Sequence, residues 1–339
     1  MDRRLVRTRR QVLVAAGAVA LLAPLTAAAA QADQPPPPGV ACQSIPLPVP
    51  AGTSSEVTGG DPTGRYLVGH VREPNGSSRV GALWNNGQHT AIDASSIPNA
   101  QMDYHDVNRH GVVVGERMTD HQTFHTDAFT YRDGKFTFLP ALRPGDSTQA
   151  LGINSRGDVV GNSSGDGWTP VVWPANRPGT VRVLPMPSGH QGDGKAVGID
   201  EDGSVVGYLS PYPPGAPYLW PAKGKPRPLS LPTGSIGGNA VAIQAGMVAG
   251  NVYDAPTYAT VPTLWNARTG SLTLHKNVQA GALSVNRDGT IGVGGALVHA
   301  DGRVSSVGDG AMVNTVDDRG VAAGATAQFN GQAVRWIGC

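Results

Sequence analysis

A twelve-residue hairpin pattern is written twice in this chain, at a spacing of 46 residues. Residues 150–161 read Ala-Leu-Gly-Ile-Asn-Ser-Arg-Gly-Asp-Val-Val-Gly, and residues 196–207 read Ala-Val-Gly-Ile-Asp-Glu-Asp-Gly-Ser-Val-Val-Gly. Each copy predicts a strand that ends in Asn or Asp, a turn that contains Gly, and an apolar strand that ends in a second Gly. A fixed period of this length indicates a repeat architecture, which limits the possible folds more than any other feature of the chain.

Seven such units can be aligned. Their two glycines are four residues apart in five units and five apart in the first and sixth units: Gly64/Gly69, Gly111/Gly115, Gly157/Gly161, Gly203/Gly207, Gly246/Gly250, Gly289/Gly294 and Gly320/Gly324. The turn residues are Asp61, Asn108, Asn154, Asp200, Gln244, Asn286 and Asp317. Asn and Asp bond to backbone two residues on, and Gly adopts positive φ, so these positions are interpreted as turn chemistry. A calcium loop would require spaced carboxylates and a terminal Glu, which these turns lack.

A third strand with an aromatic residue and a short fourth strand complete most units. The aromatic position is occupied by Trp84, Tyr131, Trp173, Trp220, Trp265 and Trp336, with His299 assigned to it in the sixth unit. We interpret these rings as packing between units. Four strands in about 45 residues are typical of a β-propeller blade. The sequence therefore predicts an all-β propeller of seven four-stranded blades, with a six-bladed ring as the alternative. The predicted units are 53–95, 101–143, 147–190, 193–235, 237–278, 279–308 and 310–339.

The two ends of the repeat region complement each other. The seventh unit stops after its third strand, at Ala-Val-Arg-Trp-Ile-Gly-Cys, whereas residues 42–50 form a strand that belongs to no unit. We expect residues 42–50 to complete the last blade, because this closes the ring and removes exposed sheet edges. The only cysteines, Cys42 and Cys339, would then flank one hairpin and form a disulfide. Lipidation of Cys42 is the alternative, but no large apolar residue lies three places before it.

The first 32 residues are predicted to be a signal peptide. Arg9 and Arg10 precede an apolar run that ends in small residues, which resembles the twin-arginine type; a retained anchor is the alternative. Residues 33–41 form a Pro-rich spacer before a single domain at 42–339. Loss of residues 1–32 removes five Arg and one Asp, which leaves a net charge near −3. Without a cluster of cations nucleic acid is not an expected partner, and we expect a secreted monomer that leaves the membrane after cleavage.

The chain resembles the HAF-repeat family of extracellular proteins. The resemblance rests on residues 127–140, Asp-Ala-Phe-Thr-Tyr-Arg-Asp-Gly-Lys-Phe-Thr-Phe-Leu-Pro, followed by the hairpin at 150–161, and it extends over nearly the whole mature chain. Asp127 stands where the family has His, and the family's Leu-Gly-x-Leu-Gly-Gly tail is reduced to Phe-Leu-Pro. The resemblance implies an exported, propeller-like fold and no established activity.

Two short motifs suggest chemistry but have simpler structural interpretations. Residues 161–165, Gly-Asn-Ser-Ser-Gly, match a nucleophile elbow, which needs a strand-to-helix turn; here they end a repeat strand. His121, His125 and Asp127 would share one face of an extended segment and suit zinc, although no other unit has this pattern. We therefore expect neither a metal site nor a cofactor.

The upper face, which carries the loops after each second strand and the connections between blades, is the expected ligand side. The first residues of the innermost strands there, which we call the mouth residues, are Glu56, Asp103, Gln149, Lys195, Asn239, Gly281 and Met312. Nearby histidines and loop aromatics are His105, His190, Trp168, Tyr212 and Tyr253.

These residues predict a non-enzymatic binding module for an extracellular sugar, peptide or cell-wall component. The first alternative is a lyase or hydrolase that uses His105, His190, Asp103 and Lys195 as acid–base groups. The second is a protein scaffold, which would present a contiguous apolar patch.

Overall fold

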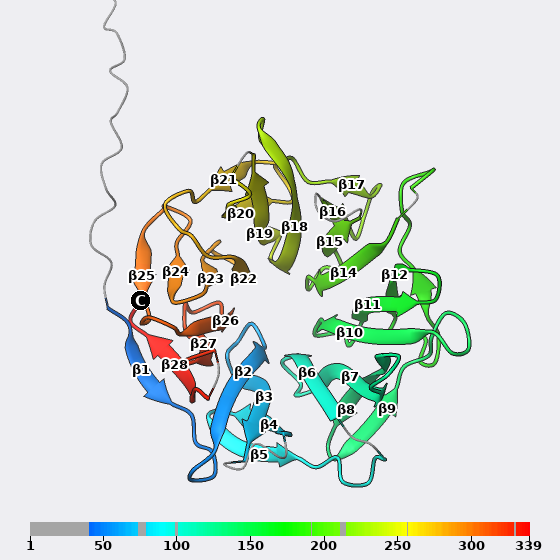
Figure 1. Ribbon diagram of the computed structural model, residues 1–339, viewed down its shortest axis with the longest axis vertical. Coiled ribbons are helices and arrows are strands. Elements are labelled where there is room, and N and C mark those ends of the chain that lie inside the picture. Colours follow the sequence, from blue (N-terminus) through cyan, green and yellow to red (C-terminus); the bar gives the residue numbers. More distant parts are fainter. Residues whose placement is uncertain are drawn as a thin grey trace, which may run out of the picture. The chain divides into compact units, whose positions relative to one another are not determined.

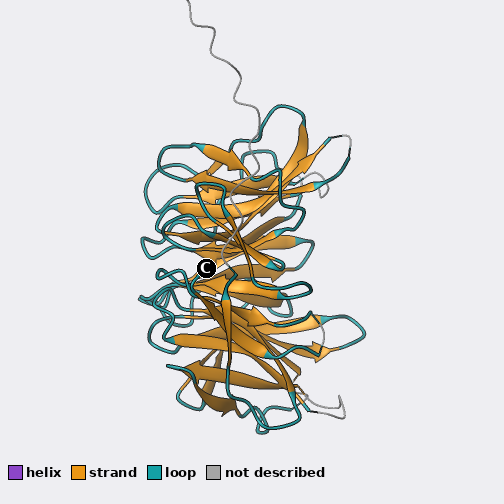
Figure 2. Cartoon of the chain, turned by 90° about the vertical axis from the view of Figure 1, so that its left-hand side faces the viewer, coloured by secondary structure: helices purple, strands orange, loops and turns teal. Residues whose placement is uncertain are grey.

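Seven antiparallel sheets of four strands each surround a central channel (Figure 1). The computed structural model describes residues 41–73, 79–98, 101–190, 192–210, 215–255, 257–328 and 330–339. The predicted signal peptide, and the spacer except for Ala41, lie outside these residues. The described residues form strands, loops and turns without a helix (Figure 2). The seven-bladed propeller is thus confirmed, and the six-bladed alternative is wrong.

The innermost strand of each blade lines the channel. These strands are β2 (Ser54–Gly60), β6 (Gln101–Val107), β10 (Ser147–Ile153), β14 (Gly194–Ile199), β18 (Ser235–Gln244), β22 (Ala282–Val285) and β26 (Met312–Val316). The second strands are β3 (Tyr66–Arg72), β7 (Val113–Asp120), β11 (Val159–Ser164), β15 (Val205–Leu209), β19 (Met247–Asp254), β23 (Ile291–Val293) and β27 (Ala322–Ala325).

The outer half of each blade holds the third and fourth strands. The third strands are β4 (Arg79–Asn85), β8 (His125–Arg132), β12 (Trp168–Trp173), β16 (Ala216–Trp220), β20 (Thr260–Asn266), β24 (Ala296–Val298) and β28 (Ala333–Ile337). The outermost strands are β5 (Gln88–Ile92), β9 (Lys135–Phe138), β13 (Arg182–Val183), β17 (Arg227–Pro228), β21 (Leu272–Leu274), β25 (Val304–Ser306) and β1 (Gln43–Pro46). The blades follow the predicted repeat units with two exceptions: β18 begins two residues early, at Ser235, and the last blade takes β1 from residues 42–50.

The ring is closed by strands from both ends of the chain. The N-terminal strand β1 (blue in Figure 1) pairs antiparallel with β28 (red), with Gln43 opposite Ile337 and Pro46 opposite Val334. A disulfide joins Cys42 to Cys339, whose Cα atoms are 4.7 Å apart. Both predictions are confirmed. In the loop-entropy model a cross-link across 297 residues contributes roughly 5–6 kcal/mol, an upper figure.

The turn residues lie on the lower face, and five of the seven make the predicted side-chain bonds to the backbone of their own turn. The side-chain oxygen of Asn108, for example, accepts from the backbone N–H groups of His110 and Val112. The same arrangement occurs at Asp61, Asn154, Asn286 and Asp317. Asp200 differs, because its carboxylate accepts from Ala245 and Gly246 in the next blade.

The second glycine of the repeat is required by close packing against the innermost strand. A Cβ at Gly161 would lie 1.8 Å from the carbonyl oxygen of Gln149, and five other blades have the same constraint. The sixth blade departs from the prediction. There Val293 occupies the glycine position and Val298 the aromatic position, so the assignments of Gly294 and His299 are wrong by one residue. Gly294 lies instead in the two-residue turn between β23 and β24, so it resembled the glycine that ends the second strand in the other units.

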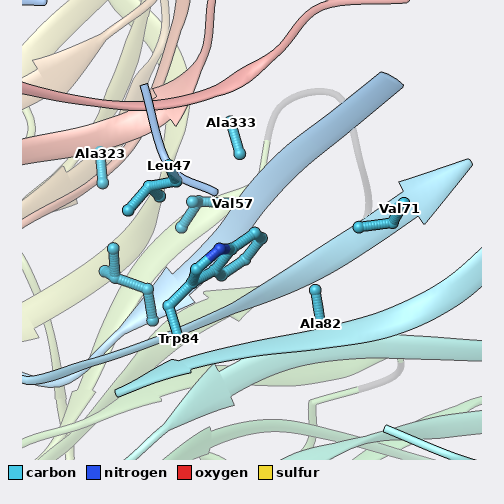
Figure 3. Packing of buried hydrophobic residues seen from close by; sticks show 8 residues of the cluster. Leu47, Val57, Val71, Ala82, Trp84, Ala323 and Ala333 are labelled. Atoms are coloured by element: carbon cyan, nitrogen blue, oxygen red, sulfur yellow. The ribbon is translucent and has the colours of Figure 1, made fainter. Parts of the chain in front are cut away.

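The core lies between the blades rather than within them. Trp84 of β4 is fully buried against Leu47 and Ala323 of the neighbouring blade (Figure 3). Its indole N–H donates to the carbonyl of Pro48, and three other tryptophans make the same bond to the segment that follows the preceding blade's outermost strand: Trp173 to Pro140, Trp220 to Pro185 and Trp265 to Ser230. Seven apolar clusters, each shared by two adjacent blades, hold the ring together, and the predicted packing role of the tryptophans is confirmed.

Candidate functional site

A β-bulge in every innermost strand turns one side chain toward the channel. At this bulge the pairing register skips one residue in each blade, and these seven residues line a cavity of about 180 Å³: Thr58, His105, Leu151, Val197, Val241, Leu283 and Asn314. In β18 the register also skips Ile236, which does not line the cavity. Bulges commonly re-aim a side chain in this way. The lining is divided, because blades 3 to 6 contribute aliphatic residues whereas blades 7, 1 and 2 contribute polar ones.

The mouth residues lie opposite residues of the second strand. The facing pairs are Glu56–His70, Asp103–Glu116, Gln149–Asn162, Lys195–Tyr208, Asn239–Asn251 and Met312–Ala325. Both members are polar on blades 1 to 5, whereas blade 7 has apolar residues at these positions. Facing side chains on a strand pair interact directly, so polar groups collect on one side of the upper mouth.

The first polar cluster surrounds a buried imidazole. His70 is 3% exposed; its Nδ1 lies 3.5 Å from Glu56 Oε1, and its Nε2 lies 3.9 Å from Asp103 Oδ1. Neither ring nitrogen makes a hydrogen bond within the described residues. Burial lowers the pKa of His70, so the ring is neutral near pH 7. A buried polar group without a partner is unusual and indicates strain or function.

Arginines balance the carboxylates of this cluster. Arg79 forms an ion pair with Asp103, and Arg72 lies 3.5 Å from Glu56. The neighbouring His70 holds the pKa of Glu56 below its ordinary value, with smaller contributions from Arg72 and Arg79. Both carboxylates are about one-quarter exposed, which makes them accessible to a ligand.

A second polar cluster spans blades 2 to 4. His105 Nε2 lies 2.9 Å from Glu116 Oε2, while the other oxygen of Glu116 accepts from Gln149 at 3.1 Å. In blade 4, Lys195 Nζ lies 4.4 Å from the centre of the Trp168 ring, a cation–π contact. Burial lowers the pKa of Lys195 although Asp193 and Glu116 act in the opposite direction.

The remaining predicted site residues lie apart from these clusters. His190 Nε2 is 3.2 Å from the backbone carbonyl of Asp193, and Asn239 accepts from Asn251. Tyr253 follows Asn251 along β19 and pairs with Gly237, and Tyr212 lies outside the described residues. Not every polar residue at the mouth is free for ligand. Asn162, which is fully buried, bonds instead to the backbone of Ala196.

Sequence reasoning missed His70, Glu116 and Arg79. A signal for the first two was present, because each directly follows the second glycine of its repeat. The register then places that residue opposite the mouth residue. Arg79 lies near the start of the third strand and carries no repeat signal.

The four proposed acid–base groups do not meet. Among the described residues, no hydrogen bond or ion pair joins any two of His105, His190, Asp103 and Lys195. The convergence expected for the enzyme alternative is therefore absent from the described part of the chain.

The two short motifs have structural roles. Ser163 lies on the strand β11, and its hydroxyl accepts from the Leu142 N–H, so no strand-to-helix elbow exists there. A turn at 121–124 separates His121 from β8, and Asp127 pairs with Arg117, so the proposed zinc face is not formed. No group of three or more His, Cys, Asp or Glu in the described residues is arranged to hold a metal ion.

Comparisons with known proteins show the fold. No protein-family model matches the chain, and no curated protein matches its sequence. The β-propeller domain of the Trilobed protease from Pyrococcus furiosus, described as having an open velcro topology, is 13% identical with a TM-score of 0.56, over 85% of this chain and 96% of that chain. Oligogalacturonate lyase from Vibrio parahaemolyticus is 9% identical with a TM-score of 0.56, over 88% of this chain and 98% of that chain. Both are similar in fold alone, and this chain differs from the first in closing its ring through β1 and β28.

Proposed function

We propose that this chain is a secreted binding protein whose ligand is held at the upper mouth of the channel. The observation that carries the proposal is the concentration of paired polar side chains on blades 1 to 5, whereas blade 7 has an apolar pair at the same position. If the mouth residues only had to contact solvent, there would be no reason for polar pairs to concentrate on one side of the channel. A ligand that is bound off-centre, against blades 1 to 4, would contact both clusters at once.

The chemistry of the mouth favours a small polar ligand. Carboxylates of Glu56, Asp103 and Glu116 alternate with the cations of Arg79 and Lys195. Such a surface offers acceptors and donors together, which suits the hydroxyl groups of a sugar or the backbone and termini of a peptide. The Trp168 ring beside Lys195 adds an apolar face for the same ligand.

Export is part of the same proposal. The twin-arginine-like leader and the Cys42–Cys339 disulfide are both typical of proteins that function outside the cytoplasm. Among the described residues, no helix is long and apolar enough to cross a membrane. Membership of the HAF-repeat family is consistent with these features and remains part of the proposal.

One observation favours an enzyme as the second candidate. The His105–Glu116 pair, at 2.9 Å, has the geometry of an oriented general base beside the channel. A hydrolase or lyase that uses this pair would turn over one of the same sugar or peptide ligands. His105→Ala would then abolish product formation from that ligand.

A thermal-shift screen tests the binding proposal. The purified protein is heated with cell-wall muropeptides, neutral and acidic oligosaccharides, and short peptides. A ligand at about 100 times its dissociation constant should add roughly 2.7 kcal/mol of stability, which is a measurable rise in Tm. We expect the rise to be lost in Lys195→Met and Asp103→Asn.

The matched control is Arg109→Met, which removes an exposed cation from the lower mouth and should preserve the shift. A shift that survives in Lys195→Met and Asp103→Asn would place the ligand elsewhere. No shift with any member of the panel would count against a small-molecule site.

A further inference from the structure

Two upper-face loops carry the same five-residue pattern, Asp-x-x-Thr-aromatic. Residues 120–124 join β7 to β8 in blade 2, and residues 254–258 join β19 to β20 in blade 5. The aromatic residues are Phe124 and Tyr258, which we call the loop-tip aromatics. Both loops join the second strand to the third strand of their blades, but the equivalent segments of the other five blades lack the pattern, so the repeat does not require it.

One side-chain bond is common to the two loops. Thr123 Oγ1 donates to Asp120 Oδ2 at 2.7 Å, and Thr257 Oγ1 donates to Asp254 Oδ2 at 3.2 Å. Each loop is four residues long, because Asp120 pairs with His125 and the Asp254 N–H donates to the Ala259 carbonyl. The sequence pattern and the bond from Thr to Asp thus recur together in the two loops.

In both loops the aromatic residue occupies a strained backbone position. The φ angle is +54° at Phe124 and +57° at Tyr258, in the left-handed region that favours Gly and Asn. The other described non-glycine residues with positive φ are Asn86, Asp133, Ala245 and Asn330, small residues or ones that tolerate the conformation. Glycine would satisfy these two turns better, so folding does not explain the aromatic rings.

The rings are also the most exposed large apolar side chains among the described residues. Phe124 is 72% exposed and Tyr258 is 71% exposed, whereas the others in this class are 38–45% exposed. An exposed ring in a strained position gains nothing from packing and is therefore best explained by what it contacts outside the chain. Both tips lie on the same face as the mouth residues, three blades apart in the ring of seven.

We propose that the loop-tip aromatics are two stacking platforms for a neutral polysaccharide that extends over the upper face. The apolar C–H face of a sugar ring packs on an isolated aromatic ring, while the polar side chains beside it bond to hydroxyl groups. The surface around Phe124 meets this need, because residues 121–123 are exposed and polar. Asp120 and Asp254 at the loop bases disfavour an anionic chain.

The arrangement fits a polysaccharide better than a protein or a membrane. Protein interfaces have an apolar centre, but the other exposed large apolar residues of the described chain lie on different elements: Ile45 on β1, Phe138 on β9, Val183 on β13, Leu231 after β17 and Leu283 in the channel. Two separated platforms instead suit a repeating polymer, which gains avidity by occupying both. This proposal does not depend on a ligand at the channel mouth.

Retention of the full chain on insoluble cellulose, chitin and mannan, together with affinity electrophoresis in soluble β-glucan, tests the proposal. We expect retention on at least one of these polymers, at least a tenfold loss of affinity in Phe124→Gly and in Tyr258→Gly, and background retention in the double variant. Phe124→Tyr should keep binding. Because glycine relieves the backbone, the Tm of each glycine variant should be unchanged or higher, which separates lost binding from lost folding.

Two variants are matched controls. Phe138→Thr removes an exposed aromatic ring from the outermost strand of blade 2 and should bind normally. Arg109→Met should also bind normally, since it alters only the lower mouth, on the face away from the two loops. Retention on none of the polymers, equal retention in the double variant, or tip-dependent sedimentation with phosphatidylcholine vesicles in place of polysaccharide would each overturn the proposal.

Discussion

The two mouths of the channel both carry polar residues, but the side chains bond to different partners at each mouth. At the lower mouth the side chains of Asn108 and Asn286 bond almost entirely to backbone, within their own turn and across to the next blade. At the upper mouth His105, Glu116 and Gln149 bond to one another, and His70 lies beside the carboxylates of Glu56 and Asp103 with no hydrogen bond of good geometry among the described residues.

This difference indicates which polar residues hold the fold and which are available to a ligand. A side chain that satisfies several backbone groups cannot be removed without leaving those groups unpaired. A side chain that contacts only other side chains can change without unravelling a turn. Function is therefore expected at the upper mouth, and stability at the lower one.

The largest expected effect concerns Asp106, which lies on the channel wall between the mouths. Its carboxylate accepts from the Val107 and Ile153 backbone N–H groups, yet desolvation raises its pKa to about 7. The folded protein thus binds this proton more tightly than the unfolded chain. The contribution of Asp106 to stability is greatest below its ordinary pKa of 3.8 and is lost as the pH rises through about 7. The unfolding free energy of Asp106→Asn minus that of wild type should therefore increase by up to about 4 kcal/mol when the pH is raised from 4 to 8.

Urea unfolding at several pH values measures this difference. Asp200, whose pKa burial also raises, is common to both proteins and cancels in the comparison. Parallel pH profiles for wild type and Asp106→Asn would show that Asp106 is not desolvated in the folded protein.

The next effect compares one asparagine from each mouth. Asn286 is 1% exposed and makes three hydrogen bonds with backbone groups of Asp288, Thr290 and Asp317. Asn286→Ala should lower the unfolding free energy by about 3 kcal/mol, because buried backbone groups lose their partners. Asn239→Ala at the upper mouth removes one side-chain bond, to Asn251, and should lower it by less than about 1 kcal/mol. Equal losses in the two variants would erase the distinction between the mouths.

The smallest effect concerns His70. His70→Leu replaces a buried imidazole, whose nitrogens lack hydrogen bonds of good geometry among the described residues, by an apolar group. The unfolding free energy at pH 7.5 should therefore change by about 1 kcal/mol or less. Burial places the folded pKa of His70 below its ordinary 6.5, so wild-type stability is full above that pH and is lost as the pH falls below it. Between pH 7 and pH 5 the variant should therefore lose less stability than wild type.

His89, His275 and His299 also have pKa values lowered by burial, but both proteins contain them, so they cancel in the difference. The difference then reports His70 together with its effect on the pKa of Glu56. A variant that unfolds at pH 7.5 would instead assign His70 a structural role like that of the lower turns.

The sequence predicted the blades well because each is defined locally. Positive φ at Gly157, the turn bonds of Asn154, and the close approach at Gly161 all depend on residues within a dozen positions of one another. In the sixth blade, where the glycine and the aromatic residue of the pattern are missing, the predicted positions were wrong by one residue, at Val293 and Val298. The candidate site was predicted only in part. Asp103 and Lys195 were found because they precede repeated strands, but their partners Arg79 and Trp168 lie on other strands.

The sequence by itself predicted seven blades, with six as the alternative, the chemistry of most of their turns, and the closure of the ring by β1 and the Cys42–Cys339 disulfide. It could do so because turns and strand periods depend on residues close in the sequence. In addition, the seventh unit lacks a fourth strand and the N-terminal strand lacks a unit, so pairing the two completes the ring. Only the tertiary structure decided which side chains meet at the upper mouth, and that Phe124 and Tyr258 stand exposed on matching loops. Those facts depend on the bulge register and on contacts between blades, which arise when strands distant in the sequence are brought side by side.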